Sequence, residues 1–295
     1  MNCNKGKVIV GMTQFACVPE RAQNMAKAEE QIRILADRGA RIICTQELFG
    51  GQYFPQIIDY TKYDWAEPLD GPTNAKMQAL AAELGVVLIS SYYEYAMDGV
   101  YYNSAAVFDA DGTLLGNYRK HHIPDGPQYL EKYYFAPGDT PYMVFHSRYG
   151  TFGVLICWDE WFPEATRIVA LKGADFVFYP SAIGSEPDHP DLDDSQTWMD
   201  GIRGHGIHNN FYVCACNRVG REEAADGSGS MEFFGRGFVS DPWGHVVAEG
   251  KRGEEDLILA ELDLDEIKRA RDILQFHRDR RPDTYGELQR RVIQE

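Results

Sequence analysis

The sequence lacks any apolar run long enough to cross a membrane, and it has no surplus of basic residues. No continuous apolar stretch approaches the roughly 20 residues that a transmembrane helix needs. The 45 acidic residues outnumber the 29 Lys and Arg residues, which gives a formal net charge of −16. Nucleic acids and anionic membranes are disfavoured as partners, because they carry negative charge themselves. We therefore expect a small molecule as the partner.

Cysteine is also scarce, and its spacing is not that of a disulfide framework. The six cysteines are scattered at positions 3, 17, 44, 157, 214 and 216. The opening stretch MNCNKGKVIVGMTQF enters a predicted strand almost at once and contains neither the apolar core nor the cleavage site of a signal peptide. These features together predict a cytoplasmic protein with reduced thiols.

The sequence contains no complete set of residues for a metal site or a phosphate-binding loop. Cys214 and Cys216 stand in a predicted strand, where we expect their thiols to point to opposite faces of the sheet. His205 and His208 lie three residues apart on a predicted helix, but no further ligand pair accompanies them. A structural zinc site usually needs four clustered ligands, and no glycine-rich phosphate loop follows a strand. We therefore expect no metal and no other cofactor.

Apolar runs alternate with amphipathic stretches along most of the chain, whose 44% hydrophobic and 25% charged residues are typical of a globular protein. The patterns predict helices at 23–38, 74–84, 163–171, 195–209 and 265–273. They predict strands at 7–12, 42–44, 86–90, 101–109, 113–119, 154–156, 176–178, 211–216, 238–240, 245–248 and 257–262. This alternation indicates an α/β protein with both sheet faces covered.

Two segments of the chain resemble each other. RGARIICTQELFG (38–50) and KGADFVFYPSAIG (172–184) share a helix end, a Gly-Ala pair, a buried strand and a glycine. The echo predicts two similar α/β halves, although ordinary strand–helix–strand patterns can produce it too. No linker divides the chain, so we predict one domain over 1–295, with the tail 274–295 in oligomer contacts. The Gly/Ser-rich segment 222–230 is expected to be a mobile loop.

Cys157 is the candidate nucleophile. It follows the apolar run at 154–156 and precedes a predicted helix that starts at Pro163, and α/β sheets present reactive groups at such turns. A nearby helix start could lower the pKa of its thiol. A buried, inert thiol is the commoner case for an isolated cysteine. The position at a strand end, with Trp158 following, favours the reactive interpretation.

Glu47 ends the strand at 42–44, at the place that Cys157 occupies in the other half. Such a carboxylate normally marks the end of a strand, but pseudo-symmetric halves would deliver both residues to one crevice. A buried Glu with a raised pKa can accept the thiol proton. His121 and His122 are alternative bases from sequence alone.

Lys120 and Glu131 lie in the long segment 120–140, which is predicted to be a loop. Long loops inside compact domains are usually functional. A lysine can stabilise the oxyanion of a tetrahedral intermediate, although a solvated loop charge is the more frequent role for an isolated lysine. Cys, Glu and Lys together suffice for acyl transfer.

At these residues the sequence resembles the carbon–nitrogen hydrolase (nitrilase) superfamily. The motifs are TQELF around Glu47, YRKHHIPDG and YLEKYYFAPGD around Lys120 and Glu131, and VLICWDEWFPEATRIVALKGAD around Cys157. Weaker similarity in CACNRVG, FVSDPWG and FHRDRRPDTY extends the resemblance over nearly the whole chain. It implies a four-layer αββα sandwich that dimerises into an αββα–αββα core, without a metal or organic cofactor.

The resemblance also implies a role for each site residue. Cys157 would be the nucleophile, Glu47 the general base and Lys120 the stabiliser of the intermediate. The backbone N–H of Trp158 would share the oxyanion hole with Lys120, and Glu131 and Tyr53 would contact the substrate.

Within the superfamily the sequence is most similar to N-carbamoylputrescine amidases, through HIPDGPQYLEKYYFAPGDT, CWDEWFPEA and FYPSAIGSEP. The similarity implies hydrolysis of a linear N-carbamoyl amide: N-carbamoylputrescine and water would give putrescine, ammonia and carbon dioxide, in polyamine biosynthesis. The acidic stretch 185–188 could pair with a substrate ammonium through Glu186 or Asp188. A solvated acidic turn is the alternative.

Arg203 indicates a different substrate, because the amidases that the sequence resembles carry a neutral residue there. It could hold the carboxylate of N-carbamoyl-β-alanine in a β-ureidopropionase-like hydrolase, or it could pair with a nearby acidic group. N-carbamoyl-D-amino-acid hydrolases carry arginines directly after the nucleophile, whereas residues 158–161 here read WDEW. A non-catalytic binding protein on the same fold is the alternative from another class, but it would be expected to lack a reactive residue.

Overall fold

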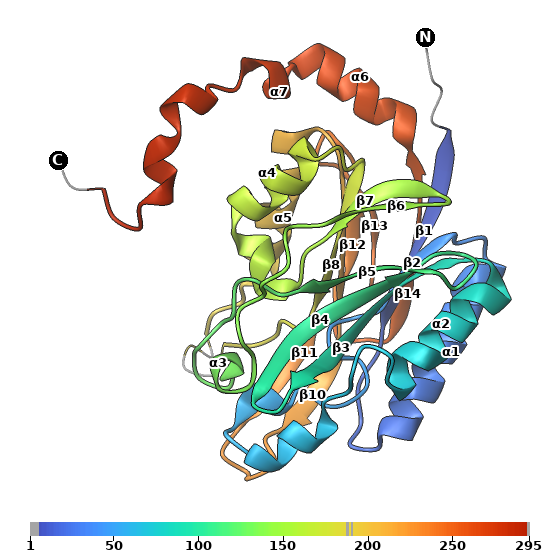
Figure 1. Cartoon of the computed structure of the whole chain (residues 1–295), viewed down its shortest axis with the longest axis vertical. Helices are drawn as coiled ribbons and strands as arrows, with labels where there is room; N and C mark the ends of the chain where they lie inside the picture. The colour runs from blue at the N-terminus through green and yellow to red at the C-terminus, as the bar shows by residue number, and fades with distance from the viewer. Residues whose placement is uncertain (1–5, 187–188, 190, 294–295) are drawn as a thin grey trace.

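The computed structural model describes residues 6–186, 189 and 191–293, and within them two six-stranded sheets face each other (Figure 1). The first sheet has the order β14 (Asp256–Asp263), β1 (Lys7–Gln14), β2 (Ile42–Cys44), β3 (Val87–Met97), β4 (Val100–Phe108) and β5 (Leu114–Arg119). The second has the order β13 (Val246–Glu249), β12 (Phe238–Ser240), β9 (Tyr212–Asn217), β8 (Phe176–Ser181), β7 (Gly150–Val154) and β6 (Val144–Ser147). A separate hairpin consists of β10 (Val219–Glu223) and β11 (Ser230–Phe234).

Helices cover the outer face of each sheet (Figure 1). The first sheet packs against α1 (Arg21–Asp37) and α2 (Pro72–Leu84), and the second against α4 (Pro163–Leu171) and α5 (Ser195–Asn209). Both α2 and α4 begin with proline. Proline lacks a backbone N–H, and it is tolerated at the first helical position because an N–H there would have no partner within the helix. The predicted four-layer αββα sandwich is thus confirmed, while dimerisation stays a prediction.

The two sheets have the same internal plan. Strands β1, β2 and β3 run parallel, as do β7, β8 and β9. An antiparallel strand flanks each parallel set on both sides, β14 and β4 in one sheet and β6 and β12 in the other. The predicted pseudo-symmetric halves are therefore present. The prediction that Glu47 and Cys157 stand at matching strand ends is wrong, because β2, which precedes Glu47, corresponds to β8, whereas β7, which precedes Cys157, corresponds to β1.

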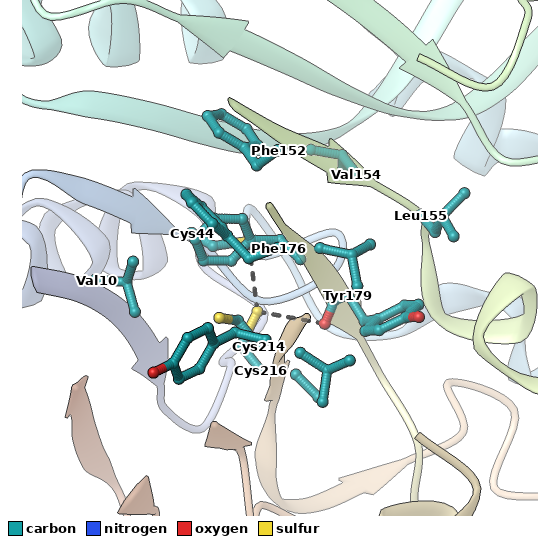
Figure 2. Packing of buried hydrophobic residues seen from close by; sticks show 14 of the residues in the cluster. Val10, Cys44, Phe152, Val154, Leu155, Phe176, Tyr179, Cys214 and Cys216 are labelled. Atoms are coloured by element: carbon teal, nitrogen blue, oxygen red, sulfur yellow. Dashed lines mark hydrogen bonds between the residues drawn. The ribbon is translucent and has the colours of Figure 1, made fainter. Parts of the chain in front are cut away.

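Inward-facing side chains of both sheets form a shared core, part of which Figure 2 shows. The sulfur of Cys216 on β9 lies 3.6 Å from that of Cys44 on β2. Cys214 belongs to the same buried core. The prediction that Cys214 and Cys216 point to opposite faces is wrong, because residues two apart on a strand share one face.

Two segments predicted to be loops contain regular structure. The 120–140 segment includes a short helix, α3 (Glu131–Tyr134), which begins at the candidate substrate-binding carboxylate. The predicted mobile loop at 222–230 overlaps the ends of β10 and β11, and Glu222 is buried in it with 1% of its surface exposed. The sequence pattern is misleading here because a charged residue in a Gly/Ser-rich context usually faces solvent.

After β14 the chain forms α6 (Leu264–Leu274), α7 (Phe276–Asp279) and two short 3₁₀ turns, Pro282–Thr284 and Gly286–Gln289. Figure 1 shows this tail extending away from the sandwich. It exposes large apolar side chains, among them Ile273, Leu288 and Val292. No helix in the described part of the chain is long and apolar enough to span a membrane.

Candidate active site

Cys157 begins a tight 3₁₀ turn (Cys157–Trp161) shortly after β7 ends. Its backbone φ is +44°, an uncommon value for a residue with a side chain and one that often marks functional turns. The turn is fastened by Asp159, whose carboxylate accepts hydrogen bonds from the N–H groups of Ile156 (3.1 Å) and His122 (2.9 Å). The side chain of Cys157 is thereby held at the strand end, 6% exposed.

The ammonium of Lys120 lies between two carboxylates. Its Nζ donates to Oε1 of Glu47 and to Oε2 of Glu131, both at 2.8 Å. All three residues are fully buried. They come from three places in the chain: the loop after β2, the end of β5 and the first residue of α3. The structure thus brings together the residues that the sequence motifs singled out.

These charges set the protonation states of the site. Burial alone would lower the pKa of Lys120, but Glu131 and Glu47 outweigh it and raise this pKa, so the side chain is a cation. Burial raises the pKa of the Cys157 thiol, Glu47 raises it further, and Lys120 opposes the shift. The expected lowering of the Cys157 pKa is therefore not found, because burial and Glu47 raise it. A neutral thiol needs a base.

Glu47 has one oxygen free for that task. Its Oε1 accepts from Lys120 and from Nδ2 of Asn103 at 2.7 Å. Its Oε2 is buried and has no hydrogen-bond partner among the described residues. Glu47 contributes directly to the raised pKa of Cys157, so its carboxylate is within electrostatic range of the thiol. An unpaired buried acceptor within electrostatic range of a neutral thiol is suited to accept its proton.

Tyr53 and Trp158 are both expected near the substrate, but Tyr53 is buried and Trp158 is exposed. The hydroxyl of Tyr53 donates to Oε1 of Glu131 at 2.6 Å, and the residue is 1% exposed. Tyr53 is therefore part of the buried polar cluster. Trp158 is 39% exposed, and its ring lies near those of Trp161 and Phe162. Trp158 lies at the surface beside the nucleophile.

Glu186 lies near the site but outside the buried cluster. Burial raises its pKa, and the neighbouring Asp194 raises it further. The pKa of Tyr129 is raised first by burial and also by Glu186, Cys157 and Asp194, so this phenol is within electrostatic range of the thiol and of both carboxylates. Asp188, the other candidate of the acidic stretch, lies outside the described residues.

Arg203 is not part of this group. Its guanidinium donates to Oδ1 of Asp200 and to the carbonyl oxygen of Gly244, both at 2.8 Å. These contacts hold it on the side of α5 away from the buried residues Trp198 and Ile202. The expected role as a clamp for a substrate carboxylate is therefore contradicted, and pairing with a nearby acidic group is what the structure has.

The alternative bases are engaged elsewhere. His122 Nδ1 lies 2.7 Å from Asp159, and His121 Nδ1 lies 2.9 Å from the hydroxyl of Tyr118. His205, a possible metal ligand by its spacing, contacts the carbonyl oxygen of Glu160 at 2.7 Å. Among the described residues, no group of three or more His, Cys, Asp or Glu side chains is arranged to hold a metal ion.

Three contributors to the site are not evident from the sequence: Asn103, Glu160 and Arg218. Asn103 interrupts the apolar run of β4, and a polar residue inside a buried strand is the available signal. Glu160 follows Cys157 in the tight turn and accepts from Ser181 (2.8 Å) and Trp198 (2.6 Å). Arg218 stands in the motif CACNRVG, whose similarity to the superfamily does not by itself indicate a role.

Comparison with known proteins agrees with this arrangement. The sequence profile of the family described as carbon-nitrogen hydrolase matches residues 9–272. N-carbamoylputrescine amidase of Solanum lycopersicum is 48% identical over 284 residues, covering 95% of this chain and 94% of the relative. Citrullinase of Francisella tularensis subsp. tularensis is 40% identical, covering 96% of this chain and 98% of the relative.

A solved structure of a related protein has the same fold. The carbon-nitrogen hydrolase from Helicobacter pylori G27 superimposes with a TM-score of 0.93 at 36% sequence identity, covering 97% of this chain and 100% of that one. The profile match spans most of the chain, and the fold and the motifs agree with it. The chain therefore belongs to the carbon-nitrogen hydrolase family and is a hydrolase of carbon–nitrogen bonds other than peptide bonds.

Proposed function

We propose that this hydrolase cleaves N-carbamoylputrescine with water to putrescine, ammonia and carbon dioxide, a step of polyamine biosynthesis. The observation that carries the chemistry is the Lys120 ammonium held at 2.8 Å from both Glu47 and Glu131, beside the buried Cys157. The plant relatives of that name, 46–48% identical over nearly the whole chain, support the substrate.

In the first half of the reaction Sγ of Cys157 attacks the ureido carbon. Because its pKa is raised, the thiol is neutral before attack, and its proton passes to the unpaired Oε2 of Glu47 as the S–C bond forms. The carbonyl oxygen becomes an oxyanion, which the cationic Lys120 and the backbone N–H of Trp158 stabilise. Glu47 then gives the proton to one of the two ureido nitrogens. Ammonia or putrescine leaves from that nitrogen, and the carbamoyl group that carries the other nitrogen remains on the sulfur.

Water completes the reaction. Glu47, again ionised, takes a proton from the water that attacks the thioester-like carbon, and the thiol leaves as the tetrahedral intermediate collapses. The carbamate product breaks down to carbon dioxide and the second amine. Glu131 stays bonded to Lys120 and Tyr53 throughout, so it orients the ammonium and the bound ureido group rather than moving protons.

The distal end of the substrate decides between related activities. N-carbamoylputrescine ends in an ammonium, and the carboxylates of the partly buried Glu186 and of Asp194 both lie within electrostatic range of Tyr129, as does the thiol of Cys157. A carboxylate-ended substrate such as N-carbamoyl-β-alanine would need a cation instead, and Arg203 is engaged with Asp200 and Gly244. The geometry therefore favours a cationic substrate.

Ammonia release from three substrates at equal concentration tests the proposal: N-carbamoylputrescine, N-carbamoyl-β-alanine and citrulline. A kcat/KM at least tenfold higher for N-carbamoylputrescine is expected. Preference for either amino acid would reject the substrate, and for citrulline would favour the activity named for the Francisella relative. Cys157→Ala is the control for mechanism, since a folded variant with full turnover would exclude Cys157 as nucleophile.

We further propose that the enzyme works in the cytoplasm as a homodimer or larger homo-oligomer. The five described cysteines are free thiols, as a reducing compartment would keep them. The exposed apolar residues of the tail support contacts between copies. A single domain over residues 1–295 remains our interpretation of the undivided chain.

A further inference from the structure

Arg218 is a fully buried cation that the proposed mechanism does not use. It directly follows β9 of the second sheet, whereas Glu47 follows β2 of the first. Its Nη2 nevertheless donates to the carbonyl oxygens of Glu47 (2.7 Å) and Leu48 (3.1 Å), and its Nη1 donates to that of Gly51 (3.3 Å). Three carbonyl groups of one short loop thus converge on a single guanidinium.

This loop needs such a partner. Leu48, directly after Glu47, has a backbone φ of +48°, in the left-handed region that residues with a side chain seldom adopt. Glu47 and Leu48 are buried, and buried carbonyls require hydrogen-bond donors. The carbonyl of Leu48 also accepts from the N–H of Gly51 at 3.4 Å, whereas that of Glu47 accepts from Arg218. A guanidinium supplies several donors in a fixed plane, which an ammonium cannot do.

Glu222 completes the arrangement on the other side. Its Oε1 accepts from Nη1 of Arg218 at 2.8 Å, and the two side chains are 1% and 0% exposed. Its Oε2 accepts from the backbone N–H of Tyr53. The Arg218–Glu222 pair therefore holds both ends of the segment 47–53, whose side chains at those ends, Glu47 and Tyr53, belong to the site.

The hydrogen bonds of Arg218, Glu222 and the site residues form a closed ring, here called the circuit. From Arg218 one path reaches the main chain of Glu47, whose carboxylate meets Lys120 at 2.8 Å. The other path runs through Glu222 to the main chain of Tyr53, whose hydroxyl meets Glu131. Glu131 and Lys120 close the circuit at 2.8 Å. A shift of the segment would therefore move the free oxygen of Glu47 relative to the thiol.

We propose that Arg218, neutralised by Glu222, is a positioning residue that fixes the main chain of Glu47 so that its carboxylate faces Cys157. The inference rests on the proposed role of Glu47 as base. It is independent of which carbamoyl compound is the substrate. A purely structural ion pair, the simpler alternative, would affect stability without acting on the thiol through Glu47.

Alkylation of Cys157 by iodoacetamide measures this role without any substrate. The S–C bond forms as the C–I bond breaks, iodide leaves, and the thiol proton passes to the base. The rate is followed at Cys157 by peptide mass spectrometry in the full-length protein, because the chain has other free cysteines. Circular dichroism and the thermal midpoint check folding in every variant.

The decisive variant is Arg218→Lys, which keeps the charge and loses the planar set of donors. We expect alkylation of Cys157 at least tenfold slower than in the wild type. Arg236→Lys is the matched control, because Arg236 also pairs with a carboxylate, that of Glu249 at 2.8 Å, away from segment 47–53. Its rate should stay within twofold of the wild type.

A double variant separates positioning from structure. In a Glu47→Gln background the effect of Arg218→Lys should fall below twofold, because the group through which Arg218 acts has been removed. A folded Arg218→Lys protein with an unchanged rate overturns the proposal, and so does a tenfold effect that persists in the Glu47→Gln background. If Arg218→Lys fails to fold, Glu222→Gln takes its place with the same criteria.

The proposed substrate and the proposed positioning role fail separately. If Cys157 of the wild-type protein is alkylated rapidly but the protein does not hydrolyse N-carbamoylputrescine, the proposed substrate is rejected. The comparison of alkylation rates between variants still tests the positioning role. Conversely, full hydrolysis of N-carbamoylputrescine by Arg218→Lys, with unchanged kcat and KM, rejects the positioning role alone.

Discussion

The ammonium of Lys120 lies 2.8 Å from Oε1 of Glu47, and solvent reaches neither side chain. Glu131 makes the second contact of the same ammonium, so one cation serves two buried carboxylates. A buried charge whose partner is removed is much more costly than an intact pair. The group proposed to stabilise the oxyanion therefore also stabilises the folded site.

Lys120→Met should accordingly impair both stability and catalysis. We expect the free energy of unfolding to fall by about 3–5 kcal/mol, because Glu47 and Glu131 would face each other without a cation. We expect kcat to fall by roughly 100-fold or more, as when a donor to an oxyanion is lost. Urea denaturation and steady-state ammonia release measure the two effects. Lys120→Arg, which keeps the charge, is the control and should lose less stability; equal losses would contradict the electrostatic argument.

Glu186 should determine affinity for the distal ammonium. Glu186→Gln keeps the shape and removes the charge, so KM for N-carbamoylputrescine should rise about tenfold, which corresponds to about 1.4 kcal/mol. The matched control is a substrate rather than a variant: butylurea has the same ureido group and carbon chain but no ammonium. Its KM should not respond to Glu186→Gln. An equal rise for both compounds would show that Glu186 shapes the loop and does not pair with the amine.

Parts of this site could be predicted from the sequence for physical reasons. Apolar runs end visibly, so the pattern alone places Glu47 and Cys157 just after buried strands, one in each half. The order of the chain then brings the carboxyl ends of parallel strands to one edge. The roles of Lys120 and Glu131 can be predicted only from similarity to a family, because the composition of a loop does not indicate which of its charged side chains point inward.

Contacts between distant segments could not be predicted in this way. The hydrogen bond from Arg218 to Glu47 joins residues 171 positions apart, and no local pattern encodes it. Glu222 looks like part of a mobile loop because its charge suggests solvent, yet Arg218 neutralises it in the interior. Arg203 misleads in the opposite direction, since a nearby Asp200 and a carbonyl group satisfy it at the surface.

The tail at 274–295 should mediate contacts between copies of the chain. Leu288 and Val292 are 65% and 68% exposed, and Ile273, directly before the tail, is 59% exposed. Several large apolar side chains exposed along one segment favour an interaction surface. Leu288→Asp combined with Val292→Asp should shift the mass measured by light scattering toward the 33.4 kDa of one chain. Val247→Asp, at an exposed position of β13 outside the tail, controls for a general effect of added charge. An oligomer that survives the tail variant would contradict this role.

Glu160 makes a pH-dependent prediction about stability. Burial is the main cause that raises the pKa of its carboxyl well above the ordinary value of 4.5, and Glu47 adds to the shift. The folded protein therefore binds this proton more tightly than the unfolded chain does. The stability that the group contributes is present below about pH 4.5 and is lost as pH rises toward the folded pKa.

Glu160→Gln should remove this dependence. An amide can accept from Trp198 and donate to the hydroxyl of Ser181, whose own proton can turn to the carbonyl of Tyr179 at 3.3 Å. The variant should match the wild type at pH 4 and exceed it increasingly above that, by at most about 1.4 kcal/mol per pH unit. Thermal unfolding of both proteins between pH 4 and pH 8 gives the difference. Ser195→Ala, at another buried polar position, should change stability by an amount that does not vary with pH. A constant difference for Glu160→Gln as well would mean that Glu160 keeps one protonation state across this range.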